Sequence, residues 1–242
     1  MSWDLITGSL PRLLSGMALT AELLAISLAI GGALAVPIAL MRVARTPLLW
    51  TPAYAYIFFF RGTPLLVQVF LVYYGLGQFE AVRESTLWPV LREAYWCAII
   101  AFSLNTAAYT AELLRGGIEA VPHGEIEAAR ACGMSGALLY RRIILPKAVR
   151  LALPAYSNEV IEMLKGTALA STITLVDLMG SARVIIARTY AVEIFFVAGV
   201  LYLAMTFVIT RVFKRVERRL SAHLRPRHTD KVVAQAGSAK ST

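Results

Sequence analysis

Glu127–Pro146 reads EAARACGMSGALLYRRIILP and interrupts a series of long apolar runs. The spacing of its charged and apolar residues predicts two short amphipathic helices, broken at Cys132-Gly133-Met134, because glycine permits a sharp change of direction. Pro122 and His123-Gly124 are expected to begin the first helix, and Pro146 to end the second. The residues alone leave one alternative for this stretch, an amphipathic loop that lies on the membrane surface.

The composition on both sides of this stretch is that of a membrane protein. Of the 242 residues, 58% are hydrophobic and 16% are charged, and the mean hydropathy is +0.64. Soluble domains carry about 25% charged residues. A chain with so little polar surface is expected to cross a bilayer several times rather than fold in water.

Five apolar runs are long enough to span the bilayer, and we expect an all-α polytopic fold. They cover about residues 17–41, 54–76, 95–114, 153–176 and 190–212. A single transmembrane domain would thus occupy residues 1–220, with a cytoplasmic loop over about 116–150. Residues 221–242 are polar and small, and we expect a disordered cytoplasmic tail.

The positive charge orients these spans. Of the 24 Lys and Arg residues, seventeen fall on the side that holds the 116–150 loop and the C-terminal tail, and five fall on the other. Lys and Arg accumulate in cytoplasmic loops, so the N-terminus is predicted outside and the C-terminus inside. The same rule explains the net charge of +9 without a nucleic-acid partner.

The stretch around Glu127 resembles the EAA loop, E-A-A-x3-G-x9-I-x-L-P, of the inner-membrane permease subunits of bacterial ATP-binding-cassette importers. The resemblance implies the type I permease fold and a coupling helix that docks into a groove on a cytoplasmic ATPase. Small alanines would let the ATPase backbone approach closely. The positions that match, and to which the resemblance assigns ATPase coupling, are Glu127, Ala128, Ala129, Gly133, Ile143, Leu145 and Pro146.

Four further segments narrow the resemblance to polar amino-acid permeases. They are residues 60–64 (FRGTP), 105–112 (NTAAYTAE), 122–127 (PHGEIE) and 156–160 (YSNEV). They look most like the M-type subunits for histidine, arginine and ornithine, and for the opines octopine and nopaline. The implied function is import of basic amino acids (arginine, ornithine, histidine, lysine) or opines across the bacterial inner membrane.

Such a subunit implies several partners. We expect a paralogous permease in a heterodimer, two cytoplasmic ATPase subunits, a periplasmic solute-binding protein and surrounding membrane lipid. A permease for another polar amino acid is the alternative. A self-sufficient secondary transporter or a non-transporting membrane scaffold are more distant ones, and the absence of an internal repeat weighs against the former.

The chain lacks the motifs of an enzyme. It has no G-x-x-x-x-G-K-[ST] phosphate loop and no Ser/His/Asp or Cys/His set, so a separate ATPase would bind ATP and Mg²⁺. Cys97 and Cys132 are expected to be free thiols. The three histidines fall in cytoplasmic segments, and we expect no metal site and no cofactor in this chain.

Polar side chains within the spans predict the substrate pathway, because a charge inside the membrane requires a partner or a watery cavity. On the fourth span, Asn158 and Glu162 share a helical stripe with Lys165, and Glu159 lies at its edge. Their carboxylates are predicted to meet a substrate amino or guanidinium group. A Glu162–Lys165 ion pair that fixes helix packing is the alternative.

The third span carries a second stripe. Asn105 and Tyr109 are spaced i, i+4, and we include them in the predicted pathway, although hydrogen bonds between spans would explain them equally well. Glu112 is expected to pair with Arg115 near the cytoplasmic end. For Arg61 in the second span we favour a structural role beside the helix break at 62–64.

Overall fold

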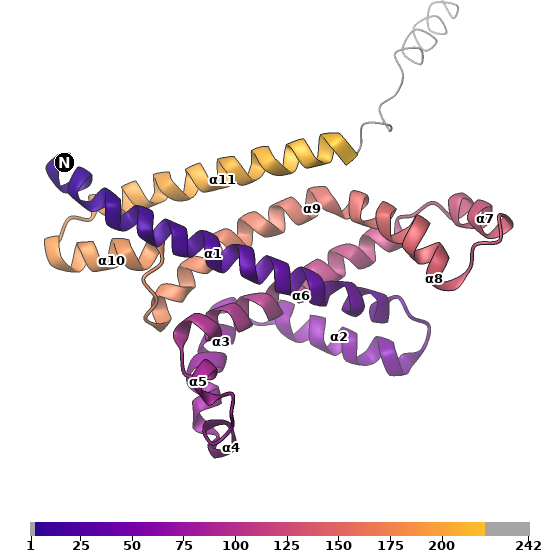
Figure 1. The fold of residues 1–242 in the computed structure, drawn as a ribbon, viewed down its shortest axis with the longest axis horizontal. Helices are drawn as coiled ribbons and strands as arrows, with labels where there is room; N and C mark the ends of the chain where they lie inside the picture. Colours follow the sequence, from indigo (N-terminus) through magenta and orange to yellow (C-terminus); the bar gives the residue numbers. More distant parts are fainter. Residues whose placement is uncertain (1–2, 221–242) are drawn as a thin grey trace, which may run out of the picture.

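A computed structural model describes residues 3–220, and every regular element among them is helical (Figure 1). The longer helices are α1 (Trp3–Arg42), α2 (Pro47–Gly62), α6 (Ala94–Glu119), α9 (Leu145–Gly166), α10 (Leu178–Thr189) and α11 (Glu193–Leu220). The shorter ones are α3 (Leu65–Phe70), α4 (Glu80–Arg83), α5 (Trp88–Leu91), α7 (His123–Ala131) and α8 (Gly136–Leu139). Two π-helical segments, η1 (Leu71–Gly75) and η3 (Tyr140–Ile144), and two 3₁₀ segments, η2 (Leu76–Gln78) and η4 (Thr167–Ile173), complete them. The predicted tail, 221–242, lies outside the described residues.

The helices account for up to five membrane spans. α1, α6 and α11 are each long and apolar enough to cross a membrane alone. Two bent pairs supply the others: residues 47–62 with 65–78, bent by 106°, and residues 136–173 with 178–189, bent by 48°. Counting each bent pair as one span gives the five that the sequence predicts. Most of these helices extend past the predicted apolar windows.

The second predicted span is therefore not a straight rod. At the break, Thr63 and Pro64 have extended backbone, with φ/ψ of −114°/145° and −61°/136°. Proline has no N–H to continue the helical hydrogen bonds, and it disfavours helical backbone at the residue before it. α3 leaves the direction of α2 at this point, and α4 and α5 follow away from the bundle (Figure 1).

The described helices pack around α6. In its most apolar stretch 72% of the residues are buried, compared with 33% in α1 and 11% in α11, so α11 presents most of its surface outward. α1 crosses α6 closely at Gly31, where an added Cβ would lie 2.8 Å from the Ser103 carbonyl oxygen. Small residues allow such close crossings in membranes. The bundle is thus centred on the helix that carries Asn105 and Tyr109.

A second close crossing, between α6 and α9, yields the first testable prediction. A Cβ at Gly117 would lie 2.5 Å from the Ala148 carbonyl oxygen, whereas a Cβ at Gly116 would have no atom within 4 Å. We expect Gly117→Ala to destabilise the purified permease by about 1–3 kcal/mol through overpacking. Thermal unfolding in detergent, followed by circular dichroism, measures this. Gly116→Ala is the matched control, and an equal loss in both variants would contradict the prediction.

Candidate functional site

The loop between α6 and α9 contains the predicted pair of helical segments and the predicted turn. α7 ends in a hydrogen-bonded cap in which the Met134 N–H donates to the Ala129 carbonyl oxygen (3.0 Å) and the Gly133 N–H to that of Arg130 (2.9 Å). Gly133 has a φ of +80°, the left-handed conformation that glycine adopts most readily. This cap redirects the chain from α7 into α8.

The prediction that Pro146 ends the second helix was wrong. Helical backbone continues from residue 136 to residue 173, and Pro146 lies in the first turn of α9. A proline within a helix normally collides with the carbonyl four residues earlier, here that of Arg142. Arg142 lies inside the π-helical segment η3, whose wider turn changes the hydrogen-bond pattern at this point.

The seven motif residues divide into two groups by exposure. Ala129, Ile143 and Leu145 belong to a hydrophobic cluster that we call the loop core. Its other members come from the ends of α1, α6 and α9 and from the loop itself, and include Leu40, Val43, Ile118, Val121, Leu139, Ile144 and Ala148. The remaining four, Glu127, Ala128, Gly133 and Pro146, are exposed.

An ion pair strengthens the attachment of the loop to the bundle. The Lys147 Nζ of α9 binds the Glu125 carboxylate of α7. Together with the loop core, this contact joins α7 to the ends of three membrane helices. α7 and α8 lie at the opposite end of the molecule from α10 and the start of α1 (Figure 1). A protein that pushed on the exposed face of α7 would therefore act on α1, α6 and α9.

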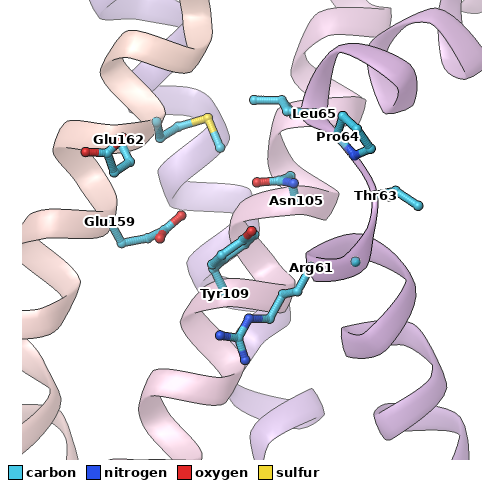
Figure 2. A pocket seen from close by; sticks show the side chains of 10 residues that line it. Arg61, Thr63, Pro64, Leu65, Asn105, Tyr109, Glu159 and Glu162 are labelled. Carbon is cyan, nitrogen blue, oxygen red and sulfur yellow. The ribbon is translucent and has the colours of Figure 1, made fainter.

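The second candidate site is a cavity of about 500 Å³ at the break between α2 and α3. Three elements form its wall: the break itself, the middle of α6, and α9 (Figure 2). Its lining residues are Arg61, Gly62, Thr63, Pro64, Leu65, Asn105, Tyr109, Glu159, Glu162 and Met163. We call it the central cavity. Asn105, Tyr109, Glu159 and Glu162 were all predicted from the sequence to line a substrate pathway.

Gln68 holds the break between α2 and α3 together. This buried glutamine was not predicted from the sequence. Gln68 Nε2 donates hydrogen bonds to the Phe60 carbonyl oxygen (2.8 Å) and to Thr63 Oγ1 (2.9 Å). Asn105 Nδ2 in turn donates to Gln68 Oε1 at 2.9 Å. The Asn105 amide, which is 5% exposed, thus bonds to another helix, in keeping with the alternative interpretation of this residue.

The charged groups of the central cavity lie on opposite walls. Glu159 on α9 and Arg61 on α2 flank Tyr109, and the Arg61 guanidinium carbon lies 5.2 Å from the centre of the Tyr109 ring (Figure 2). Glu162, one turn further along α9, forms an ion pair of 2.6 Å with Lys165. Within residues 3–220, Glu159 forms no such pair and is half-buried. Arg61 therefore belongs to the site, not only to the helix break.

Two further polar residues lie outside the central cavity. Asn158 is exposed on α9 and does not line it, because successive helical residues point about 100° apart and Glu159 takes the inward position. Glu112 Oε1 forms an ion pair with Arg115 Nη2 at 2.6 Å, and Arg115 Nη1 forms a second ion pair with Glu119 Oε2 at 2.5 Å. The Glu112–Arg115 pair was predicted.

The part of the chain from residue 3 to residue 220 contains no group of three or more His, Cys, Asp or Glu side chains suited to a metal ion. Both cysteines in it are free, Cys97 buried and Cys132 exposed. The described residues thus offer two candidate sites. One is a polar cavity whose charged groups lie apart, and the other is an exposed helical loop at one end of the molecule.

A broken-helix bundle with a polar central cavity and a protruding loop defines the class: a membrane permease. The profile of the family "Binding-protein-dependent transport system inner membrane component" matches residues 31–222, and the chain belongs to this family. Members of this family are inner-membrane components of transport systems that depend on a binding protein.

Three relatives and one solved structure resemble the chain along most of its length. Octopine transport system permease protein OccM of Rhizobium meliloti is 57% identical over 206 residues, which cover 85% of this chain and 84% of OccM. Nopaline transport system permease protein NocM of Agrobacterium fabrum is 51% identical over 229 residues, covering 94% of this chain and 95% of NocM. Histidine/lysine/arginine/ornithine transport system permease protein HisM of Escherichia coli is 46% identical over 217 residues, covering 89% and 91%. A crystal structure of an amino acid ABC transporter with histidines superposes with a TM-score of 0.80 at 35% identity, covering 90% of this chain and 99% of that one. The predicted type I permease fold is confirmed.

Proposed function

We propose that this chain is a permease subunit of an ATP-driven importer that moves basic amino acids or opines across the bacterial inner membrane. One observation carries the proposal: the central cavity presents the Glu159 carboxylate on one wall and the Arg61 guanidinium on another. A basic amino acid carries a cationic side chain at one end and a carboxylate at the other. Each end would meet a group of opposite charge.

The loop between α6 and α9, residues 120–144, which we call the coupling loop, would transmit the energy of ATP hydrolysis to the membrane helices. A solute-binding protein would deliver substrate to the periplasmic face, and two ATPase subunits would bind ATP and Mg²⁺ in the cytoplasm. We assign ATPase contact to the exposed Glu127, Ala128, Gly133 and Pro146. The packed Ala129, Ile143 and Leu145 would pass the movement of α7 to the membrane helices through the loop core. No cofactor is required in this chain.

A second permease would complete the pathway. A bundle of five spans has too few helices to enclose a path. We therefore infer a heterodimer with a paralogous permease. The excess of Lys and Arg around the loop supports a periplasmic N-terminus and a cytoplasmic C-terminus.

The test is uptake into proteoliposomes that contain this chain, its partner permease and the ATPase, with binding protein outside and ATP inside. Labelled arginine, ornithine, histidine, octopine and glutamine are compared. We expect ATP-dependent accumulation of the cationic or opine ligands. Accumulation of glutamine alone would favour a permease for another polar amino acid, and uptake without the ATPase would favour a secondary transporter.

A further inference from the structure

A second cavity adjoins the central one on the side of the coupling loop. It has a volume of about 280 Å³ and is lined by Arg42, Tyr54, Ile57, Phe58, Arg61, Gly62 and Glu112. Arg61 and Gly62 line both cavities. Along α6, Glu112 lies seven residues beyond Asn105, about 10 Å further toward the loop at 1.5 Å per residue. We call this space the inner cavity.

An arginine held in place by two aromatic rings forms part of the wall of the inner cavity. Arg42 is the last residue of α1, and its guanidinium carbon lies 4.9 Å from the ring centres of both Trp50 and Tyr54. Those rings stack in parallel, 5.1 Å apart. Cation–π contacts at such distances hold a guanidinium in place. Yet Arg42 Nε is buried and has no hydrogen-bond partner among the residues that the structure describes.

Glu112 offers the complementary group. Its Oε1 accepts a hydrogen bond from Arg115 Nε at 2.8 Å. Its Oε2 is buried and, within the same described range, receives none. Arg42 and Glu112 line the same cavity, and a ligand with both an anionic and a cationic end would match their charges.

We propose that the inner cavity is a second substrate subsite, which holds a zwitterionic α-amino acid between the central cavity and the cytoplasm. The substrate carboxylate would accept from the Arg42 guanidinium, and its amino or guanidinium group would donate to the Glu112 carboxylate. Arg61, at the boundary, would contact the carboxylate in both positions. The inference rests on the proposed function, because it takes the transported amino acid as the ligand.

Cysteine protection in the reconstituted complex without ATP tests this subsite. In a Cys132→Ser background, Phe58→Cys reports on the inner cavity and Leu65→Cys on the central cavity. Phe59→Cys, exposed and outside both linings, is the control. L-Arginine at about ten times its dissociation constant is expected to slow N-ethylmaleimide labelling of both cavity reporters about tenfold. Labelling of Phe59→Cys should not change.

Two further labelling experiments test which side chain and which substrate group make the contact. Arg42→Gln should abolish protection of Phe58→Cys and retain that of Leu65→Cys, which also shows that the variant is folded. Agmatine, which is arginine without the carboxylate, should not protect Phe58→Cys. Protection of Leu65→Cys alone would overturn the second subsite and leave the proposed function standing. Absence of protection at both reporters would overturn the central cavity as the substrate site as well.

Discussion

Ala128→Trp is expected to suppress ATP-driven uptake while the permease stays folded. Ala128 is exposed on α7, whereas its neighbour Ala129 is buried in the loop core. An indole in the middle of a close-packed helix–groove contact costs about 1–3 kcal/mol or more, which corresponds to a loss of tenfold to a hundredfold in ATPase affinity. Co-purification of the ATPase and uptake into proteoliposomes measure the two effects.

A small side chain at the same position is the matched control. Ala128→Ser adds a single hydroxyl group at the exposed position. Ala128→Ser is expected to retain most ATPase binding and uptake. If Ala128→Trp binds the ATPase as well as the unchanged chain does, the coupling role assigned to this face of α7 is wrong.

Glu159→Gln is expected to reduce arginine uptake about tenfold to a hundredfold. The substitution keeps the shape of the side chain and removes its charge. A hydrogen bond to a charged group contributes about 1.5–3 kcal/mol, and each 1.4 kcal/mol is a factor of ten. Initial rates of uptake, measured over a range of arginine-loaded binding protein, give the ratio. Transport of arginine with unchanged affinity and rate would contradict the assignment.

Glu162→Gln provides the comparison within the same cavity. Its carboxylate is already paired with Lys165, and both side chains are largely exposed, at 68% and 57%. Exposed pairs of this kind contribute about 0–1 kcal/mol. We therefore expect arginine uptake to change by less than about fivefold. A larger loss in Glu162→Gln than in Glu159→Gln would transfer the recognition role to Glu162.

Much of the coupling loop was predictable because its signals are local. Gly133 adopts the left-handed conformation at the predicted turn, and α7 begins at His123 directly after Pro122. Pro146 was misjudged for the opposite reason. Whether a proline ends a helix depends on the geometry of the preceding turn, and the π-helical segment at 140–144 has no clear signature in the sequence.

The central cavity was predictable only in part. Helical spacing brought Asn105 and Tyr109 onto one face of α6, and the structure keeps them there. The same reasoning placed Asn158 with Glu162, but it could not tell which face of α9 turns inward. Gln68 and the role of Arg61 were missed because their partners come from other helices, and only a bent span places those partners nearby.

Local sequence information was enough to predict the helical class, the apolar spans, the break at Pro64 and the turn at Gly133. These follow from residue composition and from backbone preferences that act over a few neighbouring residues. Only the packing of the helices brings Arg61, Tyr109 and Glu159 around one cavity, and Arg42 and Glu112 around another. Close packing between neighbouring helices, at crossings such as Gly31 and Gly117, sets the rotation of each helix about its axis.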